Sequence, residues 1–390
     1  MRPRLPQHAR RGGVVIYVSV SLAVLLGMTA MAVDLGILRI ARAELQTTSD
    51  GSALAGAVVL LNDERLKSPE ALNTVIGRTR SAVADVVGRN PVLNLPMTVD
   101  LNSGNAPNGD IVIGYLADPS DPNCPLRFDN PALFNSVQVR VRKDAERNGV
   151  IATGFARIFG IQSMTSGARA TATFQDGVVG YRVTEKTGNA GLLPLALHRD
   201  IWNDLMNGLI TTDNFTYDPA TGAVSAGPDG VNEINLFPGN GNGQMPPGNF
   251  GTVDIGSPNN STADISRQIR EGVNAADLAY FDGELKLDEN GTLLLNGDTG
   301  LSAAIKDDLV SIKGQPRSIP IFSEVHGPGN NAYFTIVGFV GVRIMDVRLT
   351  GAMNSKRVII QPAIVIDDST ISRPGATQSY FVYRPVGLTR

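Results

Sequence analysis

The longest apolar run in the chain lies close to its start. Residues 14–33 read VVIYVSVSLAVLLGMTAMAV and contain no charged side chain. At a rise of ~1.5 Å per residue, such a run matches a hydrocarbon core of ~30 Å. The pattern predicts one membrane-spanning helix from Val14 through Leu25 to Val33, preceded by a basic segment of residues 1–13.

The charges on the two sides of this run differ. No acidic residue precedes it, whereas the stretch that follows mixes basic and acidic side chains. Because positively charged flanks stay in the cytoplasm, we expect a cytoplasmic N-terminus and an exported remainder of the chain. The residues that set this topology are Arg2, Arg4, Arg10 and Arg11.

A cleavable secretion signal has a similar pattern. A basic start, an apolar run and the small residues Ala30 and Ala32 fit a signal with an A-x-A cleavage site. The apolar run is longer than the core of a usual signal, which favours a retained anchor. Cleavage after Ala32 stays the alternative.

An apolar and small-residue stripe continues beyond the span. Its residues recur at steps of three and four from Leu35 to Val59, which is the spacing of one helix face. Small residues on such a face let another backbone approach closely. The stripe either packs on the chain's own exported domain or binds another protein. The candidate assembly face consists of Asp34, Leu38, Leu45, Gln46, Asp50, Ala53, Ala55 and Val59.

Asp34 stands at the outer end of the predicted span. A buried charge there is costly, so we expect its carboxylate to reach interfacial water or to pair with a cation on a neighbouring helix.

Three motifs around the apolar run resemble the signature of a known family. Arg11-Gly12-Gly13 precedes the helix, AVDLG occupies residues 32–36, and LQTTSDGSALAGA occupies residues 45–57. In this order they resemble the TadE/TadG-like proteins of tight-adherence (Flp) pilus assembly. Softer similarities follow in Phe159-Gly160 and in SGARATA at residues 166–172.

The resemblance implies a non-enzymatic, single-pass protein of the bacterial inner membrane that assists assembly or anchoring of a Flp-type pilus. It implies pilus platform proteins, pilins or minor pilins as partners. One departure concerns pilin processing, because Gly13 is followed by Val18 at the fifth position where glutamate is usual. A secreted or surface-anchored adhesin, or a ligand-binding protein, is the alternative function.

The pattern beyond the stripe predicts an α/β domain at residues 34–175. Apolar periodicity predicts helices at residues 69–90 and 145–159. Short alternating runs predict strands at residues 97–101, 111–116, 136–141 and 164–174.

Residues 176–390 predict a mainly β domain with inserted helices, so the fold class is α+β. A Gly/Pro-rich tract at residues 211–258 predicts a long irregular connection. Strands are predicted at residues 319–322, 333–338, 340–349, 357–366 and 380–383. Helices are predicted at residues 195–209, 262–280 and 300–310.

Charge and cysteine content argue against a nucleic-acid-binding protein and against a fold held by disulfides. Without the four N-terminal arginines, 30 basic and 37 acidic residues remain, which gives the rest of the chain a net charge of −7. A nucleic-acid binder would need a basic patch, so no nucleic acid is expected as a partner. The single cysteine, Cys124, cannot form an internal disulfide.

The sequence contains no familiar catalytic or nucleotide motif. The three histidines, His8, His198 and His326, are far apart, and neither a nucleophile elbow nor a P-loop occurs. The glycine motif of residues 327–332 precedes a strand, so it predicts a hairpin loop and not a phosphate site. We expect no catalytic residues, no cofactor and no bound nucleotide.

Two patterns that can bind metal ions are incomplete. Asp264 and Asp367 each begin a D-x-S-x-S motif of a von Willebrand A metal site, but Gln268 and Ile371 interrupt it. No such site is therefore expected. Calcium is the alternative at the acidic residues of the glycine-rich tract, although their spacing fits no EF-hand loop. These residues are Asp213, Asp218, Asp229 and Glu233.

Overall fold

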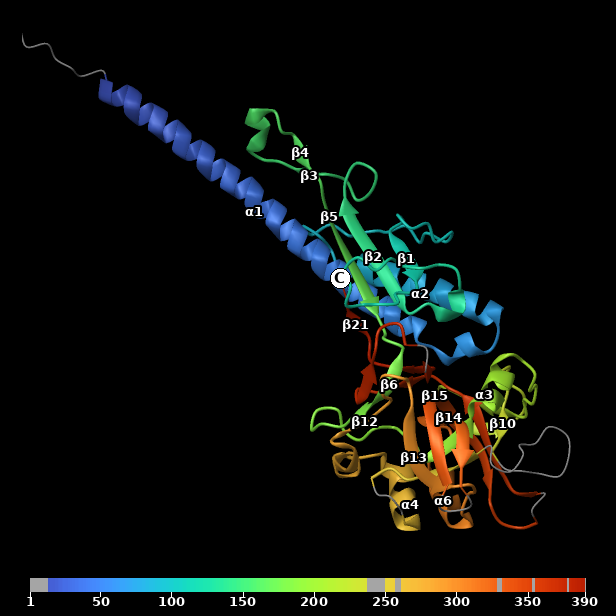
Figure 1. The fold of residues 1–390 in the computed structure, drawn as a ribbon. Helices are drawn as coiled ribbons and strands as arrows, with labels where there is room; N and C mark the ends of the chain where they lie inside the picture. The colour runs from blue at the N-terminus through green and yellow to red at the C-terminus, as the bar shows by residue number, and fades with distance from the viewer. Residues whose placement is uncertain are drawn as a thin grey trace, which may run out of the picture. The chain divides into compact units, whose positions relative to one another are not determined.

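The computed structural model describes residues 13–236, 250–256, 261–327, 332–352, 355–376 and 379–389 (Figure 1). The chain divides into two compact units. Unit 1 contains residues 1–55, 81–112 and 138–171, and unit 2 contains residues 56–80, 113–137 and 172–390. The fold is α+β, with an N-terminal apolar helix, further helices and many strands. The predicted domain boundaries stay predictions.

The N-terminal helix α1 is continuous from Gly13 to Leu60 (Figure 1). Its 48 residues contain no proline, so no missing N–H interrupts the backbone bonds. At ~1.5 Å per residue the helix is about 72 Å long. The predicted span and the stripe beyond it are therefore parts of one helix.

The helix α1, a second helix and a sheet contain residues of both units, and a small hairpin belongs to unit 1. The sheet contains four strands in the order β1-β2-β5-β21. In β2 the alternating valines 137, 139 and 141 are fully buried, which confirms the predicted half-buried strand. The elements are α2 (Pro69–Arg89), β1 (Ile111–Gly114), β2 (Ser136–Lys143), β3 (Ile151–Ala152), η3 (Ala156–Phe159), β4 (Ser163–Met164), β5 (Ser166–Thr173) and β21 (Gly387–Leu388).

The predicted helix at residues 145–159 is wrong. Asn148 and Gly149 both have positive φ, at 61° and 69°, which a helix does not allow. The chain then enters a hairpin in which Ile151 pairs with Met164. Only the single 3-10 turn η3 is helical, and Gly160 ends it with φ 85°. The predicted strand at residues 97–101 is irregular chain instead.

Unit 2 is built around the longest strand, β15 (Ala332–Arg348). One edge of β15 pairs with β14, and its other edge pairs in turn with β13, β19 and β16. The strands of this sheet are β7 (Leu195–His198), β10 (Ile234–Asn235), β11 (Phe250–Val253), β13 (Leu293–Asp298), β14 (Pro316–His326), β15, β16 (Arg357–Pro362) and β19 (Ser379–Tyr380).

The pairings of this sheet close into a ring. β15 pairs with β13, β13 with β11, β11 with β7, β7 with β14, and β14 again with β15. All of these contacts are antiparallel except that of β7 with β14. The two contacts that complete the ring are short, since β7 pairs with β14 at Ile321 and Phe322 and β11 pairs with β13 at Gly297 and Asp298.

Short helices and smaller sheets complete unit 2. The helices are η1 (Asp63–Leu66), η2 (Pro131–Leu133), α3 (Arg199–Met206), α4 (Thr262–Glu271), α5 (Ala275–Leu278), η4 (Ala279–Phe281), η5 (Ala303–Ile305) and α6 (Lys306–Ser311). The remaining strands are β6 (Val178–Arg182), β8 (Phe215–Tyr217), β9 (Val224–Ala226), β12 (Glu284–Lys286), β17 (Val365–Ile366), β18 (Thr370–Ser372) and β20 (Val382–Tyr383).

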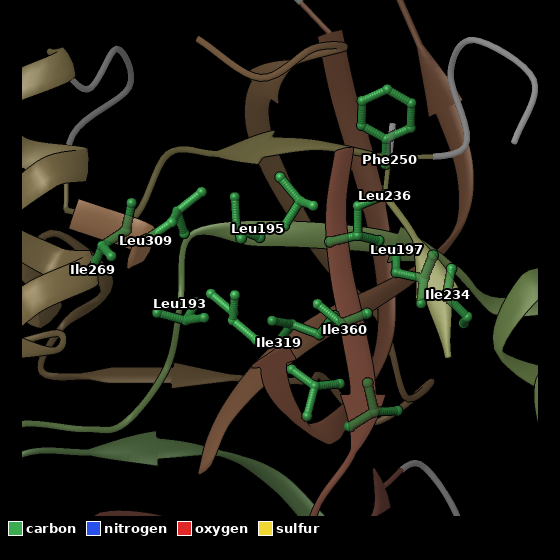
Figure 2. Packing of buried hydrophobic residues seen from close by; sticks show 14 of the residues in the cluster. Leu193, Leu195, Leu197, Ile234, Leu236, Phe250, Ile269, Leu309, Ile319 and Ile360 are labelled. Atoms are coloured by element: carbon green, nitrogen blue, oxygen red, sulfur yellow. The ribbon is translucent and has the colours of Figure 1, made fainter. Parts of the chain in front are cut away.

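Strands β7 and β11 of the ring are buried on both faces. In β7, Leu195 and Leu197 belong to one core cluster, whereas Ala196 between them belongs to another. Figure 2 shows the first cluster, in which Ile269 of α4 and Leu309 of α6 lie next to the strand residues. Because both faces are covered, the strands read as nearly continuous apolar runs.

Several predicted elements of this unit have different bounds. His198 ends β7 and caps α3, so the predicted helix 195–209 is a strand followed by an eight-residue helix. Gly272, with φ 83°, ends α4 and splits the predicted helix 262–280. The two strands predicted between residues 333 and 349 are the single strand β15. Of the predicted tract 211–258, residues 237–249 and 257–258 lie outside the described residues.

A buried carboxyl group lies where the chain leaves β5. The Tyr115 hydroxyl donates a hydrogen bond to Asp176. Burial raises the pKa of Asp176 to about 6, although this hydrogen bond partly opposes the effect. The pKa of Tyr115 is raised to about 12, mainly by burial and then by the neighbouring charge of Asp176.

The ionisation of Asp176 predicts a pH-dependent stability. Between pH 3.8 and about 6 the folded state binds more protons than the unfolded state, so this group destabilises the fold as pH rises. Asp176→Asn removes the ionisation but keeps an acceptor for Tyr115. Relative to the wild type, its free energy of unfolding should increase by roughly 2–3 kcal/mol between pH 3.8 and 7, as measured by denaturant unfolding.

Asp129→Asn is the matched control. Asp129 is exposed, and its hydrogen bond with Arg127 lowers the pKa of Asp129. The control should therefore lose stability relative to the wild type as pH rises. The same pH dependence of stability in Asp176→Asn as in the wild type would contradict a raised pKa of Asp176.

Candidate functional site: the anchor helix and its clamps

The first twenty residues of α1 after Gly13 expose apolar side chains on all sides. Val14, Leu25 and Val33 are 68%, 60% and 46% exposed. Thr29 donates its hydroxyl proton to the Leu25 carbonyl at 2.9 Å, so this polar group is satisfied within the helix. A helix that is apolar all round fits a lipid environment and not an aqueous one. We call residues 14–33 the anchor.

A clamp holds the end of the anchor. The Asp34 carboxylate accepts hydrogen bonds from the backbone N–H groups of Gly154, Phe155 and Ala156, at 2.9, 3.0 and 2.6 Å. Asp34 is 4% exposed. Three donors compensate the charge that burial would otherwise penalise. The expected partners were water or a neighbouring cation, but the structure places a hairpin backbone there.

The sequence of the hairpin allows its backbone to come close to the Asp34 carboxylate. A Cβ atom added at Gly154 would lie 3.3 Å from the nearer carboxylate oxygen, which is a tight contact. The three donors stand at the start of η3, where successive N–H groups have no helical partner. The backbone N–H groups of residues 154–156 thus form a small anion-binding site, and the carboxylate of Asp34 occupies it.

A second clamp acts ten residues further along α1. Glu44 accepts a hydrogen bond from the backbone N–H of Leu93 at 2.7 Å. Leu93 and Asn94 have φ values of 52° and 61°, and the turn is closed by pairing of Val92 with Leu95. The carboxylate thus fixes a turn whose backbone is costly for residues other than glycine.

The predicted assembly face divides between buried and accessible residues. Leu45 and Ala53 are fully buried, and Asp34 is nearly so. Gln46 is exposed and donates to Asp50 at 2.7 Å. Intermediate burial applies to Leu38, Asp50, Ala55 and Val59. The chain itself therefore covers part of the stripe, and the role of these residues in binding another protein stays a prediction.

A different side of the same helix is open. Ile40 and Val58 are 18 residues apart, which is five full helical turns, so they lie on one side of α1. They are 54% and 59% exposed, which is unusual for large apolar residues in water. Sequence periodicity did not single out Ile40 or Val58. It also missed Glu44 and Gly154, because a bond between distant segments leaves no local spacing to detect.

The acidic residues proposed for calcium bind backbone groups instead. Asp213 accepts from the N–H groups of Asp229 and Gly230, and Glu233 accepts from those of Asn214 and Phe215. Asp218 and Asp229 also accept backbone N–H bonds. The bonds from Ala220 to Asp218 and from Val231 to Asp229 are local turn contacts of the usual kind. The others join segments 12 to 19 residues apart.

The two incomplete metal motifs have structural roles of the same kind. Asp264 forms a capping box with Ser261 at the start of α4. Asp367 accepts hydrogen bonds from Gly191 N–H and from the backbone and hydroxyl of Ser369. Within the described ranges, no group of three or more metal-ligating side chains comes together.

Comparison with family models gives one match, to the family described as putative Flp pilus-assembly TadE/G-like, over residues 12–59. This segment is similar to that family. It coincides almost entirely with α1, so it contains the anchor and both clamp carboxylates. Searches of curated proteins and of solved structures found no match.

The TadE/G-like segment and the apolar helix together indicate a pilus-related membrane protein. The match covers Gly12-Gly13 and the motifs at residues 32–36 and 45–57, whereas Arg11 lies just before it. The softer similarities beyond residue 59 lie outside it.

The Asp34 clamp predicts a local change on mutation. Asp34→Ala removes the one acceptor shared by the N–H groups of residues 154–156. The amides of residues 154–156 should lose protection against hydrogen exchange by at least about tenfold, because the hairpin opens more often. Hydrogen exchange of the full-length chain in lipid nanodiscs, read by mass spectrometry, measures this.

Asp50→Ala is the control, since Asp50 lies on the same helix and its bond to Gln46 is within that helix. It should leave the protection of residues 154–156 unchanged. Equal protection in Asp34→Ala and the wild type would show that the clamp does not hold the hairpin.

Proposed function

We propose that this chain is a non-enzymatic, single-pass protein of the bacterial inner membrane that assists the assembly or anchoring of a Flp-type pilus. The observation that carries the proposal is that the TadE/G-like match and the helix α1 have nearly the same bounds. The part of the chain related to pilus assembly is therefore the part suited to a membrane and to close helix packing.

The proposed action is mechanical placement. α1 passes without a break from the anchor into unit 1, where the Asp34 and Glu44 clamps attach it to folded chain. A continuous helix transmits position better than a flexible linker does. The exported part would thus be held at a set height above the bilayer, where pilins, minor pilins or a platform protein can bind.

The accessible side of α1 is the proposed contact surface. Its exposed apolar residues outside the anchor include Ile40 and Val58. Gly36 and Gly51 lie on the same helix, and a Cβ atom added to either would meet no atom within 4 Å. Small residues with open space around them suit a close approach by a helix of another protein.

The chemistry of the described side chains favours this role over catalysis. His198 contacts the Ser323 carbonyl and caps α3, and His326 lies beside Glu324 on β14. Both have structural partners. The acidic loops are likewise occupied by backbone donors, which supports a protein that works through its surfaces.

Co-purification tests the proposed partners. A C-terminally tagged full-length chain, extracted from its native membranes in mild detergent, should retain pilus components identified by mass spectrometry. Val58→Arg should reduce their recovery at least about fivefold, because it places a charge on the open apolar side. Asn73→Arg, at an exposed position of α2, is the control and should retain them.

The outcomes separate the proposal from its alternatives. No pilus component with the wild type would contradict the assembly role. Normal recovery with Val58→Arg would contradict the contact surface. A purified chain that begins at Val33 would mean that the helix is a cleaved signal, and the secreted adhesin or ligand-binding protein would replace the proposal.

Cysteine labelling tests the proposed orientation. Cys124 is the single cysteine and is partly exposed. In spheroplasts with an intact inner membrane, a membrane-impermeant maleimide should label it. The variant His8→Cys/Cys124→Ser should react only after permeabilisation. The reverse pattern would place the bulk of the chain in the cytoplasm.

A further inference from the structure

An exposed apolar tip lies next to the end of the anchor. It is formed by the β3–β4 hairpin around η3, and we call residues 155–161 the hairpin tip. Ile158 is 80% exposed, Phe159 63%, Ile161 51% and Phe155 45%. Four large apolar residues exposed within seven positions are expected at an interaction site and not on an ordinary soluble surface.

The Asp34 clamp fixes the position of the tip along the helix. Phe155 and Ala156 donate backbone hydrogen bonds to Asp34, the first residue after the anchor. The tip therefore lies beside the helix where the apolar run ends. In Figure 1, the β3–β4 hairpin extends along α1 toward the N-terminal half of that helix.

The charges around the tip favour a lipid surface. No acidic residue occurs between positions 147 and 175, whereas Arg157 stands in the middle of the tip. On α1, Arg39 and Arg42 are exposed shortly after the clamp. The carboxylate of Asp34 is already held by backbone donors. Basic side chains beside exposed apolar residues are typical of segments that lie in the headgroup region.

We propose that the hairpin tip inserts into the outer interface of the same bilayer that the anchor crosses, with Phe155, Ile158, Phe159 and Ile161 among the headgroups and upper acyl chains. The occupant of this surface is therefore lipid. The argument rests on continuity, because the tip is tied to the residue at which the lipid-facing part of α1 ends. A retained anchor is required, but a role in pilus assembly is not.

Insertion would give the protein a second attachment to the membrane. One helix alone leaves the exported part free to rotate about the helix axis and to tilt. A second contact beside the helix restricts both motions. The hairpin is held rigid by its own contacts. Its two strands pair through Ile151 and Met164, and Thr153 donates its hydroxyl proton to the Ile161 carbonyl at 2.5 Å.

Fluorescence quenching tests the proposal on the full-length chain. In a Cys124→Ser background, Phe159→Cys carries an environment-sensitive nitrobenzoxadiazole label. The protein is reconstituted into vesicles of phosphatidylethanolamine and phosphatidylglycerol at about 3:1, a ratio chosen to supply anionic headgroups. Aqueous iodide and a lipid with a nitroxide close to its headgroup are the two quenchers.

The control label stands at Ser103→Cys, an exposed loop position of the same unit. Compared with this control, the Phe159 label should be quenched at least about threefold more by the shallow nitroxide and at least about fivefold less by iodide. Ile158→Cys should behave like Phe159→Cys, which guards against a local disturbance by one substitution. The intact mass of each protein establishes that the anchor is retained.

Two results would overturn the proposal. If both tip labels are as accessible to iodide as the control, the tip lies in water. If they are protected from iodide but not quenched by the lipid nitroxide, protein covers the tip, either a second copy or another chain. Neither result bears on the recovery of pilus components, so the assembly role and the lipid contact fail separately.

Discussion

The carboxylate of Asp34 determines how the folded chain is joined to the end of the membrane anchor. At the end of a long apolar helix, an unpaired negative charge would favour water and would draw the folded chain away from the bilayer surface. Three backbone N–H groups from the hairpin compensate the charge in place. The folded part of unit 1 can therefore begin directly at the last residue of the anchor, and no spacer is needed between them.

Unit 2 follows a different principle. Its central strand β15 has partners along both edges, and the ring of strands that contains β15 closes on itself. Pairing along both edges of β15 stabilises the unit from within. Interaction with other molecules is thereby left to surfaces and loops, whereas the strands supply rigidity.

The sequence predicted the elements whose causes are local. The anchor follows from twenty uncharged residues, and strand β2 follows from the alternation of Val137, Val139 and Val141. The helix predicted at residues 145–159 does not form, because Asn148-Gly149 favours a left-handed turn that outweighs the apolar spacing. The long strand β15 was predicted as two strands divided at Phe339, but this residue is paired with Pro320 of β14 and the strand continues through it.

The candidate site was predictable only in part. Asp34 was recognised as unusual from its place at the end of the span, but its partners lie about 120 residues further along the chain. Nothing in the spacing of Gly154, Phe155 and Ala156 indicates that their N–H groups converge on one carboxylate. Ring closure in unit 2 was equally hidden, because it depends on which strands meet and not on where each strand lies. Long-range contacts of this kind set the energetics of the fold and require three-dimensional coordinates.

The two clamps on α1 also set a rotational phase. Successive residues of an α-helix are turned by about 100°, so one inserted or deleted residue between Asp34 and Glu44 would swing one carboxylate away from its donors while the other stayed engaged. Substitutions on the open side of this ten-residue stretch disturb neither bond. The stretch should accordingly tolerate changes of side chain far better than changes of length. Its length fixes the directions in which the hairpin and the turn at Leu93 lie around the axis of α1.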